Sequence, residues 1–273
     1  MTRGAGLGGR AEWQPSPPAV AALGSDGGVL YQGSNSADAG DLFRSTDGGW
    51  TWTRVSDGLP GESGVEGLLL VGTKLFAATA EGAFRSPDDG GTWSAASHGT
   101  AGIRGVESLL LHQGKAYVGL TTNSGGGRRV WRSGDAGATW LGDPGTPPGA
   151  ARALLSYGDA VWAGLLGAAR GVYRSTDAGI TWSAMSDGLA GDALFVNRLA
   201  DLEGELYLAS EGSGVYRWDG ASWVEAGLAR EFVDELLPVA GVLVAGSALG
   251  EHILYSRGPG RHLGAVRLGL RGR

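Results

Sequence analysis

An eight-residue pattern, Ser-x-Asp-x-Gly-x-Thr-Trp, occurs four times in this chain and limits the folds available to it more than any other feature. The four copies, called octets below, end at Trp52, Trp93, Trp140 and Trp182. Successive tryptophans are therefore 41, 47 and 42 residues apart, and an aromatic residue followed by an arginine precedes every octet. A motif that returns at such intervals indicates a repeat architecture, in which each repeat forms one supersecondary unit.

The octet has the residues of a tight turn between two strands. Serine and aspartate side chains accept hydrogen bonds from backbone N–H groups in turns, and glycine adopts a positive φ without steric cost. Threonine favours the strand that follows, and tryptophan adds a large apolar face. We therefore predict a structural turn role for these residues: Ser45, Asp47, Gly49 and Trp52; Ser86, Asp88, Gly90 and Trp93; Ser133, Asp135, Gly137 and Trp140; Ser175, Asp177, Gly179 and Trp182.

Short runs with the composition of β-strands accompany each octet. In the second unit these are residues 65–71, 74–79 and 82–86 before the turn and 92–95 after it. Four short strands joined by turns are typical of a propeller blade. Six such units can be counted, the fifth with a shortened octet and the sixth without one. The sequence therefore predicts an all-β fold: a single six-bladed β-propeller with four antiparallel strands per blade and the octet in the hairpin between the third and fourth strands.

The expected propeller covers residues 11–268, between a flexible N-terminus (1–10) and a tail (269–273). Its blades are expected at about 14–55, 56–96, 97–143, 144–185, 186–226 and 227–262. Trp13 lies 39 residues before Trp52, where a fourth strand would end, but no three strands precede it. Since closing a ring removes exposed sheet edges, we expect either 11–16 or 263–268 to complete the last blade, and the sequence does not choose between them.

Composition excludes several classes of partner. The formal net charge is -6, so no overall basic field attracts nucleic acid. No stretch approaches the roughly 20 apolar residues of a membrane span, and the N-terminus lacks an apolar signal region. The chain has no cysteine, and its four histidines show no metal-ligand spacing. We therefore expect a soluble monomer without cofactor or metal, in the cytoplasm unless an export signal is missing.

The octets resemble the Asp-box, or BNR repeat, of sialidases, sortilin-type receptor domains, two-propeller xyloglucanases and the photosystem II stability and assembly factors. The resemblance covers about 250 residues, from Trp13 to His262, with four full motifs and two decayed ones. It implies a propeller fold in which the Asp-box is structural and lies on the face away from the ligand. Unrelated functions share this repeat, so the resemblance does not select one activity.

Catalysis of the sialidase type is not supported by the residues. A sialidase needs a tyrosine nucleophile, but six of the seven tyrosines occupy repeated strand positions and only Tyr157 lies outside them. The arginines before the octets also belong to one repeated position, and the Arg-Ile-Pro signature that opens sialidase domains is absent. The chain is also long enough for only one propeller of a xyloglucanase. The enzymatic alternative is a glycoside hydrolase that uses Glu66 and Glu107 as acid/base groups.

The face opposite the octets carries the residues that are not repeated, which is where function usually lies on a repeat scaffold. Aligning the first strands of the units places one polar residue per unit around the channel mouth: Glu66, Glu107, Arg152, Asn197 and Asp234. This ring is either a solvated channel rim or a binding site for a small polar or carbohydrate ligand.

Two further features are expected beside this ring. Residues 121–129 form a basic loop that ends with Arg128 and Arg129, which is either a tolerated insertion or a flap over a partner. Phe195 and Phe232 are expected as exposed aromatic residues near the same rim. We therefore predict a non-catalytic binding or scaffolding propeller for a protein segment or a glycan. The alternatives are the glycoside hydrolase and a propeller similar to the photosystem assembly factors, although the long arginine-rich patch expected of a photosystem partner is not evident.

Overall fold

The computed structural model describes residues 20–257 apart from 27, 35–40, 61–63, 72–73, 97–104, 121–128, 136, 143–144, 146–147 and 247–252. Within these residues the strands form six antiparallel sheets, five with four strands and one with three. The strands of every sheet are adjacent in the order in which they occur along the chain. No helix in this part of the chain is long and apolar enough to cross a membrane.

The first three sheets contain twelve short strands. The first sheet consists of β1 (Val20–Asp26), β2 (Val29–Ser34), β3 (Leu42–Ser45) and β4 (Thr53–Arg54). The second consists of β5 (Val65–Val71), β6 (Lys74–Thr79), β7 (Gly82–Ser86) and β8 (Ser94–Ala95). The third consists of β9 (Val106–His112), β10 (Lys115–Leu120), β11 (Val130–Ser133) and β12 (Leu141–Gly142).

The other three sheets follow the same plan, with a short 3-10 helix, η2 (Gly191–Leu194), between the fourth and fifth. The fourth sheet consists of β13 (Ala150–Tyr157), β14 (Ala160–Leu166), β15 (Gly171–Ser175) and β16 (Ser183–Ala184). The fifth consists of β17 (Val196–Leu202), β18 (Glu205–Ser210), β19 (Gly214–Trp218) and β20 (Trp223–Gly227). The sixth consists of β21 (Glu235–Val239), β22 (Val242–Gly246) and β23 (Ile253–Arg257).

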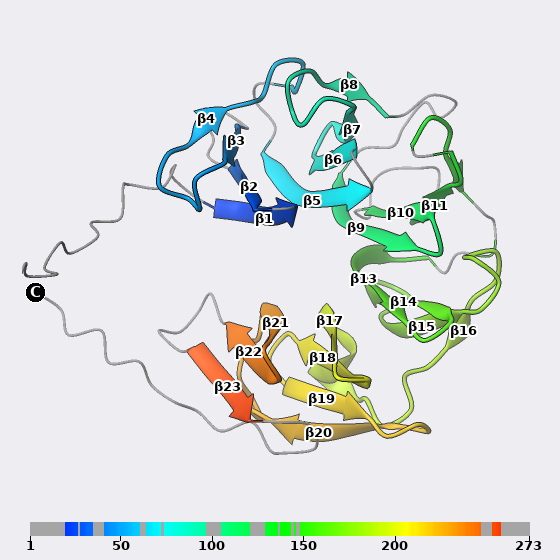
Figure 1. The fold of residues 1–273 in the computed structure, drawn as a ribbon. Helices are drawn as coiled ribbons and strands as arrows, with labels where there is room; N and C mark the ends of the chain where they lie inside the picture. Colours follow the sequence, from blue (N-terminus) through cyan, green and yellow to red (C-terminus); the bar gives the residue numbers. More distant parts are fainter. Residues whose placement is uncertain are drawn as a thin grey trace, which may run out of the picture.

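The sheets are arranged around a common centre, with the first strand of each on the inside (Figure 1). First strands of successive sheets are in contact: β1 with β5, β5 with β9, β9 with β13, β13 with β17, and β17 with β21. The core lies between neighbouring sheets. Tyr31 and Leu42 of the first sheet, for example, pack with Leu75 and Ala77 of the second, and all four side chains are buried. Because each sheet buries its apolar face against the next, no sheet is expected to be stable alone.

The octets form the turns between the third and fourth strands, as the sequence predicts. In the first octet, Gly49 N–H donates to Ser45 Oγ (2.9 Å), and Asp47 accepts bonds from the Thr51 N–H (2.9 Å) and the Thr51 hydroxyl (2.6 Å). The serine hydroxyl also donates to the aspartate (2.7 Å). The same four bonds occur in the other three octets, at Ser86 and Asp88, Ser133 and Asp135, and Ser175 and Asp177.

These hydrogen bonds favour the ionised form of the octet carboxylates. The bond from the Thr51 hydroxyl, with the one from the Thr51 N–H, lowers the pKa of Asp47 from its ordinary 3.8 to about 2. The corresponding threonines lower the pKa of Asp135 and Asp177 to about 2 as well. An aspartate held ionised by its own turn is a poor general acid, because it would have to carry a proton near neutral pH.

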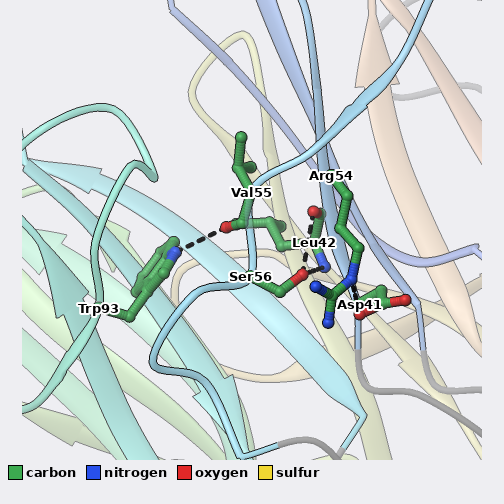
Figure 2. A network of polar contacts seen from close by, with 6 residues as sticks. All are labelled: Asp41, Leu42, Arg54, Val55, Ser56 and Trp93. Carbon is green, nitrogen blue, oxygen red and sulfur yellow. Dashed lines mark hydrogen bonds and ion pairs between the residues drawn. The ribbon is translucent and has the colours of Figure 1, made fainter.

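A second set of polar contacts lies where the chain leaves the first sheet and passes the second (Figure 2). The indole N–H of Trp93, in the second sheet, donates to the carbonyl of Val55 (2.8 Å) in the segment that leaves the first sheet. The adjacent Ser56 hydroxyl accepts a bond from the Leu42 N–H (2.8 Å) and donates to the Leu42 carbonyl (3.3 Å), which fixes that segment against β3. Arg54 forms an ion pair with Asp41 beside it, with 2.6 Å between Nε and Oδ1.

The tryptophan and serine contacts recur between the fourth and fifth sheets. Trp223 donates its indole N–H to the Met185 carbonyl (2.7 Å), and Ser186 bonds both backbone groups of Val172. This second motif, Ser-Asp-Gly-Leu after a fourth strand, occurs at 56–59 and 186–189.

Strand β1 was not identified from the sequence, and it supplies the first strand of the first sheet. The expected closing segments, 11–16 with Trp13 and 263–268, lie outside the described residues. Within the described residues, the sixth sheet has three strands, so β23 has a partner on one side only.

Candidate functional site

The polar position aligned around the channel has a shared structural cause. Each of the strands β5, β9, β13 and β17 changes register with its neighbour at this position, so that Glu66, Glu107, Arg152 and Asn197 are the extra residues of β-bulges. A bulge leaves one residue out of the ladder and re-aims its side chain. Asp234 immediately precedes β21, where its N–H donates to the Gly246 carbonyl (2.9 Å).

These residues do not form a uniform exposed rim. Glu107, Arg152 and Asp234 are half-buried, and the side chain of Glu66 is outside the described part of the structure. Asn197, expected at the rim, is instead 1% exposed, because its amide donates to the Val233 carbonyl (3.0 Å) in the segment that enters the sixth sheet. Asn197 therefore holds two sheets together and does not offer its amide donor to a ligand.

The basic loop is described only at its end. Arg128 lies outside the described residues, and Arg129 is half-buried, with its carbonyl accepting a bond from the Leu120 N–H (2.8 Å). This bond ties the end of the loop to β10.

The structure brings Phe195 and Phe232 together in one pocket. A cavity of about 170 Å³ is lined by these two residues and by Asp192 and Glu211. Both phenylalanines, expected to be exposed, are half-buried. The cavity lies where the fifth and sixth sheets begin.

The pocket is on the face opposite the octet turns. Asp192 belongs to η2 and Phe195 directly precedes β17, whereas Glu211 lies in the turn between β18 and β19 and Phe232 precedes β21. In an antiparallel sheet, the turn between the second and third strands is at the end where the first strand starts. The turn between the third and fourth strands, which carries the octet, is at the other end.

Hydrogen bonds connect all the segments that line the pocket. Glu211 N–H donates to the Phe195 carbonyl (2.9 Å), and Phe195 N–H donates to the Asp192 carbonyl (3.0 Å). On the other side, Gly214 N–H donates to the Glu231 carbonyl (3.0 Å), next to Phe232.

Two side-chain contacts also fix the walls of the pocket. The Asn197 amide holds Val233, and Arg198 of β17 donates two bonds to the carboxylate of Glu235 in β21. A pocket whose walls are fixed in this way loses little conformational entropy when it is filled.

The pocket combines two aromatic rings with two carboxylates. Asp192 is exposed and Glu211 is half-buried, and among the described residues neither carboxylate has a side-chain hydrogen bond or an ion pair. The guanidinium carbon of Arg170 lies 5.0 Å from the centre of the Phe195 ring, within the range of a cation–π contact. A Cβ at Gly212, whose φ is +88°, would lie 3.5 Å from Phe232 and 3.8 Å from Asp192, so this glycine leaves the pocket open.

Asp192 and Glu211 were not singled out from the sequence. Glu211 could have been found by the rule that loops between second and third strands lie on the face away from the octets, since it opens such a loop. Asp192 lies in a connection without a counterpart in the other units, so the repeat gives no signal for it. No cluster of three or more histidine, aspartate or glutamate residues suited to a metal is present in the described ranges.

No protein-family model matches the chain, and no curated protein is similar to it in sequence. Solved structures do match it over nearly its whole length. The structure "YCF48 bound to D1 peptide" is 16% identical, with a TM-score of 0.65 over 91% of this chain and 82% of that one. YCF48 from Cyanidioschyzon merolae is 10% identical, with a TM-score of 0.66 over 92% and 85%.

The fold is therefore that of the β-propellers. The GH74 xyloglucanase from Xanthomonas campestris has the same fold, with 20% identity and a TM-score of 0.69. The match covers 90% of this chain but only 46% of the xyloglucanase. Since these identities are low, the likeness concerns the fold and carries no activity from one protein to another.

Proposed function

We propose that this chain is a six-bladed propeller of the BNR/Asp-box type that acts as a non-catalytic binding module for a protein segment. The segment binds on the face opposite the octets, at the pocket between Phe195 and Phe232. The observation that carries the proposal is this pocket, in which two aromatic side chains from consecutive sheets meet at a fixed, open site.

The size of the pocket favours a protein segment over a glycan. Pockets that enclose a whole small ligand usually measure about 300–1,000 Å³, whereas this one has about 170 Å³. It is suited to one side chain of an extended segment that continues over the surrounding surface. The complex of the similar YCF48 with a D1 peptide is a precedent for peptide binding on this fold.

The glycoside-hydrolase alternative gains no support from the described residues. Its two carboxylates, Glu66 and Glu107, are bulge residues on β5 and β9, and Glu107 is half-buried. The aspartates of the octets are held by their turns, as described above. A role similar to that of the photosystem assembly factors is one form of the peptide-binding proposal and rests on the same pocket.

Screening wild type and variants against a peptide array and a glycan array tests the proposal. Phe195→Ala and Phe232→Ala should each weaken the captured peptides roughly tenfold or more, because aromatic anchors in pockets dominate such interfaces. Trp50→Ala is the control, since Trp50 is 47% exposed but lies in an octet. The proposal is wrong if Phe195→Ala and Phe232→Ala bind the captured peptides as tightly as Trp50→Ala does. It is also wrong if only glycans bind.

A further inference from the structure

We infer that the pocket between Phe195 and Phe232 selects a positively charged side chain, lysine or arginine, and holds it against the carboxylates of Asp192 and Glu211. The inference rests on the proposed function and specifies which segments the propeller binds. Nothing in the repeat itself points to this choice, because the four residues come from connections that differ between units.

The charge of the pocket is the first argument. Two of its four lining side chains are carboxylates, and within the described residues neither one has a hydrogen bond or an ion pair of its own. The nearby Glu235 carboxylate, in contrast, accepts two bonds from Arg198. Asp192 and Glu211 are therefore available to a cation from outside, and an anionic ligand would be repelled.

The aromatic rings supply the second argument. The face of an aromatic ring attracts a cation through its quadrupole. Phe195 already shows this property, because the guanidinium of Arg170 lies 5.0 Å from its ring centre. Phe232 supplies a second ring to the cavity, and Arg170 is not among the residues that line it. The long methylene chain of lysine or arginine also suits such a pocket, since it packs on apolar surface while the charged end reaches a carboxylate.

The geometry of the walls supports selectivity as well as binding. The segment of Phe195 is tied to Asp192 and Glu211 by backbone hydrogen bonds, and the Asn197 amide ties β17 to Val233, beside Phe232. The segments that carry the two rings and the two carboxylates are therefore held in fixed positions relative to one another. Arg170, which contacts Phe195, and the charged residues within two positions of Phe232 in the chain, Arg230, Glu231 and Asp234, do not line the cavity.

Peptides that differ only at one central residue test the inference. The host is a peptide captured by the array, with lysine, arginine, norleucine or glutamate at the anchor position, and affinities are measured by fluorescence anisotropy. Wild type should prefer lysine and arginine over norleucine by about tenfold, from one cation–π contact and two exposed charge pairs. Raising the salt concentration should reduce this preference, because exposed charge pairs are screened.

The variant Asp192→Asn/Glu211→Gln should lower the preference to about twofold, which the ring contact alone provides. The control Glu203→Gln/Glu225→Gln also removes two negative charges, but from exposed positions outside the pocket, and should leave the preference unchanged. If wild type binds norleucine as well as lysine, or if the preference survives in Asp192→Asn/Glu211→Gln, the inference is wrong. The proposed function still stands in that case if Phe195→Ala weakens all four peptides, and it falls with the inference if Phe195→Ala weakens none.

Discussion

The indole N–H of Trp93 donates to the Val55 carbonyl across the boundary between the first two sheets, at 2.8 Å (Figure 2). In contrast, Trp52 donates to Gly49 (3.1 Å) within its own octet and is half-buried, whereas Trp93 is 7% exposed. Two tryptophans at the same repeat position therefore have different roles, and within the described residues only the indole of Trp93 donates to a neighbouring sheet.

This difference predicts unequal effects of the same substitution. Trp93→Phe should lower the free energy of unfolding by about 1–3 kcal/mol, because it removes a hydrogen bond between two sheets and leaves the carbonyl of half-buried Val55 without its donor. Trp52→Phe is the control and should cost less than about 1 kcal/mol, since water can replace a partly exposed donor. Urea unfolding followed by tyrosine and tryptophan fluorescence measures both, and equal losses would contradict the role assigned to Trp93.

Gly58, in the turn before the second sheet, is required because the chain passes close to the backbone of Trp93 there. Its φ is +96°, and a Cβ there would lie 2.4 Å from the Trp93 carbonyl oxygen. Gly58→Ala should therefore cost about 3 kcal/mol, from the positive φ and the forced separation of two backbones. Gly220→Ala has a similar φ of +105° but no atom within 4 Å, and should cost only about 1 kcal/mol. Thermal melts compare the two, and similar melting temperatures would show that the contact is unimportant.

The octet aspartates predict a pH dependence of stability. The pKa of Asp47, Asp135 and Asp177 is lowered from 3.8 to about 2 in the folded state. A carboxylate with a depressed folded pKa stabilises the fold at pH values above its unfolded pKa, and this contribution is lost as the pH falls toward the folded pKa. The free energy of unfolding should therefore decrease between about pH 4 and pH 2.

Asp135→Asn tests this assignment. The variant should be less stable than wild type at pH 7, and the difference should shrink as the pH approaches 2, because about half of the folded wild-type carboxylates are then protonated. Urea unfolding at several pH values gives the comparison. A difference that stays constant from pH 7 to pH 2 would show that the hydrogen bonds of the ionised Asp135 do not contribute.

The sequence predicted the repeated parts of this fold better than the rest. The octet turns and β6 were found because their residues recur at fixed intervals. β1 (Val20–Asp26) was missed because its Ala-Ala-Leu-Gly centre has neither the alternation nor the bulky residues of a typical strand. The alignment located the position of the bulges but did not predict that Asn197 is buried. A polar residue at a bulge gives the same sequence pattern whether it faces solvent or bonds a neighbouring sheet. Asp192 belongs to a connection found once, which a repeat-based comparison cannot identify.

The closing of the ring remains a prediction that truncation can test. We expect 11–16 or 263–268 to supply the strand that β23 lacks on one side within the described residues. One of two truncated chains, beginning at residue 17 or ending at residue 262, should therefore melt at a lower temperature and aggregate more readily, because an open sheet edge is exposed. The other truncation should have little effect. Two truncations without effect would exclude both segments as the closing strand.

Asn197 links the stability of the fifth and sixth sheets to the binding pocket. Its amide donates to the Val233 carbonyl, and Val233 is next to Phe232 in the chain. Asn197 itself follows Phe195 by two residues. Asn197→Ala should cost about 1–3 kcal/mol, because it leaves a buried carbonyl without its donor, and it should also weaken the captured peptides through loss of the fixed spacing between the two rings. Ser86→Ala is the matched control, since Ser86 is fully buried and accepts the Gly90 N–H (2.8 Å) in an octet on the opposite face. It should lose a similar stability but keep its affinity. If both variants bind peptides as wild type does, Asn197 supports the fold alone and the pocket does not depend on it.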